Sequence, residues 1–153
     1  MKNLKKSISK ILKTTFGKNC KIIEPVNIYG SKIGNNVFIG PFVEIQRNSR
    51  IGSNSRIQSH SFISEKVTIG EKCFISHGVM FTNDLMRNGK IQRNPRLFKK
   101  TKIGNGVIIG SNSTILPVNI SNNIVVGAGA VVTRDLKIKG IYAGSPAKLI
   151  RRL

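Results

Sequence analysis

Hydrophobic residues recur at every sixth position through the first half of this chain. The register runs through Ile33, Ile39, Ile45, Ile51, Ile57, Ile63, Ile69, Ile75 and Phe81. A spacing of six matches neither the 3.6-residue period of an α-helix nor the alternation of a simple strand. It predicts a short unit that repeats, each copy placing one aliphatic side chain in a shared core.

The other positions of the unit fit a narrow coil. The residue after the isoleucine is often glycine, which suits a corner with positive φ. The fifth position takes only small side chains: Val37, Val43, Ser49, Ser55, Ser61, Val67, Cys73 and Val79. Three units would close a turn of about 18 residues, stacked on the next turn at the roughly 4.8 Å spacing of paired strands. This register predicts that Ile57, Ile75, Ile109 and Val126 stack on one face.

With this pattern, residues 22 to about 149 resemble the hexapeptide-repeat acyltransferases. The resemblance implies an all-β fold, a left-handed parallel β-helix of triangular section. We expect five to six coils over residues 22–137, a basic capping segment at 1–21 and a basic tail at 138–153.

Short helices are predicted at both ends. Over residues 3–13, Leu4, Ile8, Ile11 and Leu12 are spaced at helical intervals with lysines between them. This pattern favours a helix that caps the open column, and a helix for a membrane surface or a partner is the alternative. Near the other end, Ser145 and Pro146 are typical of the N-cap and first residue of a final basic helix.

The register stops after Phe81 and resumes at Ile103. Residues 82–102 should therefore leave the column as a loop, and Gly89, Pro95 and many cations argue against regular structure there. An excursion of this length inside so regular a fold is usually functional.

Charge is unevenly distributed along the chain. The net charge is +20, and Lys/Arg residues concentrate in 1–21, 87–102 and 134–153. The pattern favours a polyanionic ligand such as a nucleotide, a coenzyme or a phospholipid surface. Nucleic acid is not expected, because there is no Trp, only two Tyr, and no interleaving of basic with aromatic residues.

Other composition features indicate a cytoplasmic protein. No apolar run approaches the ~20 residues that span a bilayer, and residues 1–21 lack the features of a secretory signal. Two cysteines are too few for a disulfide framework or a metal knuckle, and Cys73 occupies a small core position.

The two histidines are candidate catalytic residues. His60 and His77 are 17 residues apart, close to one turn of the coil, so they should project from neighbouring coils. His77 opens the stretch from 77 to 84, His-Gly-Val-Met-Phe-Thr-Asn-Asp, which leads into the loop.

That stretch resembles sugar-nucleotide N-acetyltransferases, especially those acting on dTDP-3-amino-3,6-dideoxyhexoses. Residues 26–30, 41–46 and 57–62 are similar to the same group. The resemblance implies acetyl-CoA-dependent N-acetylation of a nucleotide-linked amino sugar for surface polysaccharide or glycan biosynthesis. It implies substrate binding by Phe42, Glu44, Gln46, His60 and Phe81.

The implied reaction is attack of a free amine on a thioester. A neutral imidazole suits the task of accepting the amine proton, so His77 is the first candidate base, with Asn83 or Asp84 positioning the amine or a sugar hydroxyl. The departing sulfur is an alternative proton acceptor, which leaves His77 as an orienting group.

Small residues in the later coils are candidates for binding acetyl-CoA. Gly110, Ser111 and Ala128 would let a pantetheine arm approach backbone amides. The segment 143–148 resembles the family's Gly-Asn-Pro-Ala-Lys, which implies that Ser145, Pro146, Lys148 and Arg151 lie near the adenine and phosphates. The family also implies a homotrimer with active sites between subunits, and no metal is expected.

Three other functions remain open. An O-acetyltransferase for a sugar or serine hydroxyl would share the fold and coenzyme site but need a firmer base. A metal hydrolyase of the carbonic anhydrase type would need three histidines, and two are present. A non-enzymatic scaffold would not need the basic loop or the small coenzyme-type coils.

Overall fold

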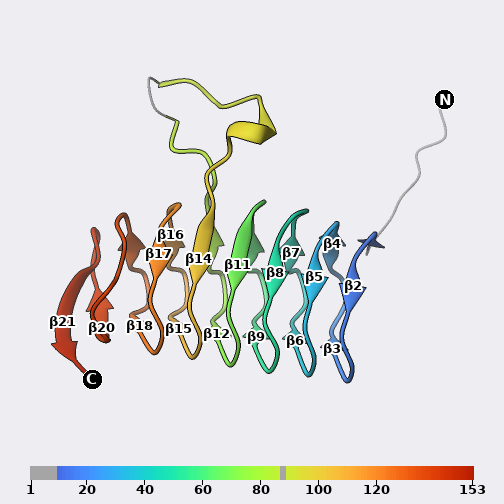
Figure 1. The fold of residues 1–153 in the computed structure, drawn as a ribbon, viewed down its shortest axis with the longest axis horizontal. Helices are drawn as coiled ribbons and strands as arrows, with labels where there is room; N and C mark the ends of the chain where they lie inside the picture. The colour runs from blue at the N-terminus through green and yellow to red at the C-terminus, as the bar shows by residue number, and fades with distance from the viewer. Residues whose placement is uncertain (1–9, 87–88) are drawn as a thin grey trace.

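The fold is a parallel β-solenoid of triangular section, shown as a row of stacked coils in Figure 1. The computed structural model describes residues 10–86 and 89–153. Apart from the last two strands of the chain, strands three apart pair with each other, so the coil faces form three sheets of seven, six and eight strands. All pairings are parallel except that of the last two strands.

The strands are short and recur in strict order. Sheet A contains β1 (Lys10–Leu12), β4 (Asn27–Tyr29), β7 (Glu44–Ile45), β10 (Phe62–Ile63), β13 (Met80–Phe81), β16 (Thr114–Ile115) and β19 (Val131–Val132). Sheet B contains β2 (Thr15–Phe16), β5 (Lys32–Ile33), β8 (Arg50–Ile51), β11 (Val67–Ile69), β14 (Thr101–Ile103) and β17 (Asn119–Ile120). Sheet C contains β3 (Lys21–Ile22), β6 (Phe38–Ile39), β9 (Arg56–Ile57), β12 (Phe74–Ile75), β15 (Ile108–Ile109), β18 (Val125–Val126), β20 (Gly140–Ala143) and β21 (Lys148–Arg152).

The six-residue register forms the core, as predicted. Ile57 pairs with Ile75, Ile75 with Ile109, and Ile109 with Val126, and each is at most 1% exposed. Three serines at the small positions are also buried, and their hydroxyls donate to backbone carbonyls: Ser49 to Ser64 O, Ser55 to Gly70 O and Ser61 to Ser76 O. The coil interior is therefore largely apolar, and the backbone satisfies these three hydroxyls.

The predicted N-terminal helix is wrong over the part that the structure describes, because Lys10–Leu12 forms β1. Ile11, Phe16 and Ile22 stack on Ile28, Ile33 and Ile39. The repeat thus begins earlier than the strict register suggests, with one five-residue step between residues 11 and 16. Residues 3–9 of the predicted helix lie outside the described residues. With this coil included, there are about seven turns rather than five to six.

The predicted C-terminal helix is also wrong. A turn at Ser145 and Pro146, joined by a cis peptide bond, leads into β21, which pairs antiparallel with β20. Strand β20 would otherwise end sheet C with an open row of backbone groups, and β21 occupies that edge. Within the described residues, no helix is long and apolar enough to cross a membrane.

The predicted loop is present and stands off the column between β13 and β14 (Figure 1). Its described residues include a turn of 3-10 helix, η2 (Pro95–Leu97), whose N-cap is Asn94.

Each coil has three corners, and each corner joins two of the sheets. The loop corner joins sheet A to sheet B and releases the loop. The asparagine corner joins sheet B to sheet C. There, side-chain oxygens accept from turn amides of the adjacent coil: Asn35 from Lys18 N, Ser53 from Asn35 N, Asn105 from Glu71 N and Asn122 from Asn105 N. The third corner, from sheet C to sheet A, is the site corner.

Candidate active site

The site corner brings many of the predicted functional residues into one column. Its backbone ladder runs from His60 N to Pro41 O, Gly78 N to Ser59 O, Asn112 N to His77 O, and Gly129 N to Ser111 O, with lengths of 2.8–3.1 Å. Phe42, His60, His77, Ser111 and Ala128 therefore follow one another along one edge of the solenoid. The substrate candidates occupy the earlier coils and the coenzyme candidates the later ones.

His77 is an exposed side chain held by a neighbour in the preceding coil. Its Nδ1 lies 2.8 Å from the Ser59 hydroxyl oxygen. When Nδ1–H donates to that hydroxyl, the other ring nitrogen, Nε2, has a free lone pair and can accept a proton. Sequence reasoning gave Ser59 no role, although its position 18 residues before His77 indicates the adjacent coil.

His60 makes a different contact from the same corner. Its ring stacks on Phe42 with centroids 4.8 Å apart and planes at 29°. Both residues have positive φ, and Phe42 is 58% exposed. The histidines do come from neighbouring coils, but their partners differ, since His77 contacts Ser59 and His60 contacts Phe42.

A shallow groove of about 340 Å³ lies beside this aromatic pair. Its lining residues are Pro25, Val26, Asn27, Phe42, Val43 and Glu44. Phe42 supplies an apolar ring and Glu44 a carboxylate, so the groove can hold a flat ring and a cationic or hydroxyl group. Two of the predicted substrate residues therefore line a real depression.

Glu44 and Gln46 belong to a polar network on sheet A and the loop corner. Gln46 donates to Glu44 Oε1 at 2.9 Å and accepts from Glu65 N at 3.2 Å. Glu65 is buried and pairs with Arg47 at 2.6 Å. Burial, then the nearby Glu44 carboxylate, raises the pKa of the Tyr29 hydroxyl. Both the NH₂ group and the oxygen of the Gln46 side chain are therefore already hydrogen-bonded within the protein.

Phe81, Asn83 and Asp84 do not face the site corner as the sequence suggested. Phe81 is fully buried in the core, so the expectation that it binds substrate is corrected. The Asp84 carboxylate accepts from Met86 N at 2.9 Å and Gln92 N at 2.7 Å, and Asn83 O accepts from Lys99 N at 3.0 Å. Asn83 and Asp84 order the loop, which leaves from a different corner from that of His77.

The later coils leave backbone amides open at the site corner. Among the described residues, no acceptor pairs with Ser111 N–H or Ala128 N–H. Gly110 leaves no space for a side chain, since a Cβ there would lie 2.4 Å from Ala128 N. Ser113 holds the two coils together by donating to Gly110 O and Gly127 O.

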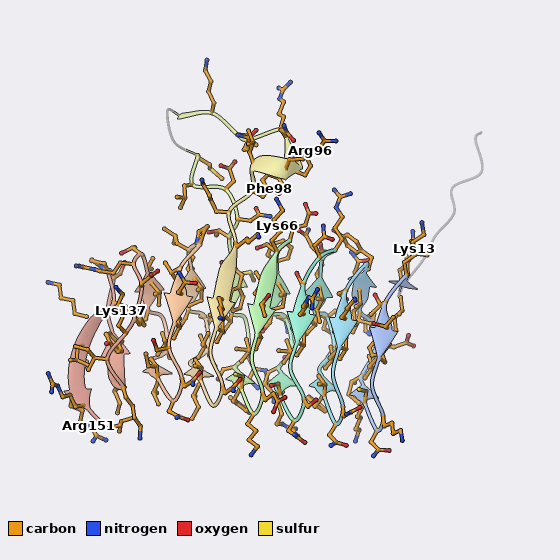
Figure 2. The ribbon with its side chains drawn as sticks, viewed as in Figure 1. Lys13, Lys66, Arg96, Phe98, Lys137 and Arg151 are labelled. Carbon is orange, nitrogen blue, oxygen red and sulfur yellow. The ribbon has the colours of Figure 1, made fainter. Side chains whose placement is uncertain are left out.

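The C-terminal candidates lie on or beside the last strand. Ser145 and Pro146 are exposed in the turn, and Lys148 and Arg151 are exposed on β21 (Figure 2 labels Arg151). Lys148 also lines a pocket of about 390 Å³ together with Arg134 and Asp135. These cations form a basic end to the solenoid.

No metal-binding group is found in the part of the chain that the structure describes, where no three His, Cys, Asp or Glu side chains come together. Burial raises the pKa of the Cys73 thiol, whose sulfur donates to Gly104 O. Cys73 is therefore a core residue, as expected.

Comparisons with known proteins agree with this architecture. Residues 30–65 match the family described as bacterial transferase hexapeptide (six repeats), and residues 100–134 match the hexapeptide repeat of succinyl-transferase. Among solved structures, a single-residue mutant of AntD, an N-acyltransferase from Bacillus cereus in complex with dTDP and coenzyme A, has a TM-score of 0.81. It is 27% identical over 92% of this chain and 84% of its own. A second AntD mutant is 30% identical at the same coverage, with a TM-score of 0.78.

Other relatives are more distant or shorter in overlap. A mutant of GDP-perosamine N-acetyltransferase from Caulobacter crescentus shares the fold at 22% identity and a TM-score of 0.66, over 87% of this chain and 54% of that one. Galactoside O-acetyltransferase of Escherichia coli (strain K12) is 46% identical over 52 residues, 33% of this chain and 26% of the relative. The chain thus spans only about a quarter of such curated relatives. It belongs to the hexapeptide-repeat acyltransferase family.

Proposed function

We propose that the protein transfers the acetyl group of acetyl-CoA to the amino group of a nucleotide-linked amino sugar, a dTDP-3-amino-3,6-dideoxyhexose in the first instance. The observation that carries this proposal is the order of groups along the site corner and the adjoining edge of sheet A. An aromatic pair and a carboxylate come first, a histidine follows, and open backbone amides come last. The similarity to AntD, which was crystallised with dTDP and coenzyme A, supports the same assignment.

In the proposed reaction, the amine nitrogen attacks the thioester carbonyl and the C–S bond then breaks. The amine proton passes to Nε2 of His77, whose orientation Ser59 maintains, and the thiolate leaves to take up a proton. A sugar amine should titrate near the ~8 of an α-amino group, so a neutral fraction exists at pH 7. The Ser111 or Ala128 amide can donate to pantetheine carbonyls or to the developing oxyanion.

A homotrimer with sites between subunits is part of the proposal. The outward side chains of sheet C are mostly apolar, with Phe74, Ile108, Val125 and Ile141 in successive strands. Sheet B instead presents Lys32, Arg50 and Lys102. The site corner borders the apolar sheet, so a second copy packed there would enclose His77, whereas sheet B would remain in solvent. Light scattering should report three chains, and Ile108→Asp should reduce that number.

A cytoplasmic location is also proposed. Both cysteines are free thiols in the structure, which is usual where thiols are kept reduced.

The test of the proposed function is a substrate screen. Purified protein is incubated with acetyl-CoA and with 3-amino and 4-amino dTDP- and UDP-sugars, and thiol release is followed. Galactosides and serine form a matched set of hydroxyl acceptors. Turnover with amino sugars alone is expected, and preference for a hydroxyl acceptor would replace the proposal with O-acetylation.

A further inference from the structure

One lysine of the column, Lys66, binds the loop between β13 and β14 through its side chain. The Lys66 ammonium donates to three backbone carbonyls of the loop: Pro95 O at 2.7 Å, Arg96 O at 3.0 Å and Phe98 O at 3.2 Å. Figure 2 shows Lys66 at the base of the loop, below Arg96 and Phe98. An ammonium has three N–H groups, so the loop uses its full donor capacity.

The three carbonyls belong to the segment that organises the rest of the loop. Phe98 is followed by Lys99, whose N–H bonds to Asn83 O and so ties the two ends of the loop together. Asp84, next to Asn83, accepts from Gln92 N on the far side. The lysine therefore binds a segment whose next residue, Lys99, is hydrogen-bonded to the other end of the loop at Asn83.

Several other polar groups at the loop base are poorly paired. Among the described residues, three buried hydroxyls have no hydrogen-bond partner, and all three lie at the loop base: Ser64 Oγ, Thr82 Oγ1 and Thr101 Oγ1. The backbone bond from Thr101 N to Lys66 O is 3.3 Å, longer than most ladder bonds of the column. Thr82 N still donates to Ile115 O at 3.0 Å, and among the described residues Lys66 supplies the side-chain hydrogen bonds between the column and the loop.

We propose that Lys66 is a positioning residue that clasps the 95–98 segment in place, so that the loop cations meet the nucleotide phosphates of the acceptor. The second part of this statement rests on the proposed function. The loop carries Lys90, Arg93, Arg96, Lys99 and Lys100, all exposed. Because all three N–H groups of Lys66 donate to loop carbonyls, we expect Lys66 to act through the loop and not to contact the substrate itself.

Limited trypsin digestion tests the clasp without reference to activity. Cleavage after Arg96 breaks the peptide whose carbonyl accepts from Lys66, whereas cleavage after Arg93 lies outside the clasped segment. In Lys66→Met, cleavage after Arg96 should accelerate about tenfold relative to cleavage after Arg93, because the segment opens more often. Mass spectrometry of the early fragments gives the ratio within one sample.

Lys72→Met is the matched control. Lys72 has the same left-handed backbone, with φ of 55° against 65° for Lys66, and lies exposed at the asparagine corner. The control loses the same charge and should leave the cleavage ratio unchanged. An unchanged ratio in Lys66→Met as well would overturn the clasp, even if the enzyme is active.

Kinetics and rescue then test the positioning role. Lys66→Met should raise the KM for the nucleotide sugar about tenfold, with kcat changed by less than about threefold and the KM for acetyl-CoA unchanged. In a Cys20→Ser background, Lys66→Cys alkylated with 2-bromoethylamine restores an ammonium at this position and should recover both the cleavage ratio and the KM. Cys73 is buried and should not react. A changed cleavage ratio with unchanged KM would remove the loop from acceptor binding while leaving the clasp in place.

Discussion

The asparagine corner and the site corner use the same turn geometry in opposite ways. At the asparagine corner, the second amide of a turn is capped by a side-chain oxygen of the next coil, as Asn122 caps Asn105 N at 2.8 Å. At the site corner the equivalent positions carry Ser111 and Ala128, whose amides find no acceptor among the described residues. A donor that the protein satisfies itself adds stability, whereas one left open can serve a ligand.

The sharpest contrast concerns the side chain that each corner presents. The asparagine corner presents amide oxygens that face the protein, and the site corner presents an imidazole whose Nδ1 is held by Ser59. His77→Ala should lower kcat by about 10²-fold or more, since a positioned base contributes at that level. The melting temperature should not change, because His77 is exposed.

Ser59→Ala provides the graded comparison for the same measurement. It removes only the group that orients the ring, so its loss in kcat should be smaller than that of His77→Ala. Normal turnover in His77→Ala would exclude the histidine as base and leave the coenzyme sulfur as the proton acceptor.

Converting one corner into the other is the next test. Ala128→Asn places a side-chain oxygen one coil from Ser111, as Asn122 lies one coil from Asn105. The new side chain should cap Ser111 N–H and weaken acetyl-CoA binding about tenfold, the value of one lost hydrogen bond. Isothermal titration calorimetry measures the Kd.

Ser121→Asn adds the same side chain at the asparagine corner and serves as the control. Its affinity for acetyl-CoA should equal that of the wild type. If Ala128→Asn also binds normally, the Ser111 amide is not a coenzyme donor.

The reverse change should affect stability and not chemistry. Asn105→Ala removes the acceptor of Glu71 N–H, a bond of 2.9 Å. The free energy of unfolding should fall by about 1 kcal/mol, as for a typical hydrogen bond. Urea denaturation measures it, and kcat/KM should not change. A large kinetic effect would show that the corners are not independent.

The smallest expected effect lies at the end of the solenoid and depends on pH. Hydrogen bonds from the Asn119 backbone and side chain lower the pKa of Asp135 below its ordinary value of 3.8. The carboxylate therefore stabilises the fold above that value, and the contribution is lost as pH falls through the lower folded pKa. Because Asp135 is exposed, Asp135→Asn should cost about 0.5 kcal/mol or less near neutral pH. Thermal melts from pH 7 downward should show the two proteins converging in acid.

The period predicted the column and the contents of the site corner, because a strict spacing determines which side chains stack. Ile57, Ile75, Ile109 and Val126 followed directly from it, and so did the break that begins the loop. The N-terminal end was missed because Leu4, Ile8, Ile11 and Leu12 are spaced as in an amphipathic helix, while the five-residue step from Ile11 to Phe16 breaks the six-residue register. At the C-terminus, Ser145 and Pro146 favour the start of a helix, but the following residues pair with the open edge of sheet C as β21. That edge exists only once the column has folded.

Side-chain partners were harder to predict than positions. The Ser59–His77 contact depends on rotamers at a corner, and the Lys66 clasp joins residues about 30 apart through a loop without a repeat. Asp84 was expected to face substrate because of a resemblance. Its carboxylate instead accepts hydrogen bonds from two backbone amides of the loop, and these bonds depend on the conformation of the loop.

Because the coils stack evenly, the distance between equivalent side chains along the site corner changes only in steps of one coil. Neighbouring positions on the corner, such as Ser59 and His77 or Ser111 and Ala128, differ by one strand spacing, roughly 4.8 Å. Moving a functional residue by one coil in the sequence shifts it along the same edge by that step and leaves its orientation unchanged. Acceptors of different length could therefore be accommodated in evolution by relocating a single side chain up or down the edge, without remodelling a pocket.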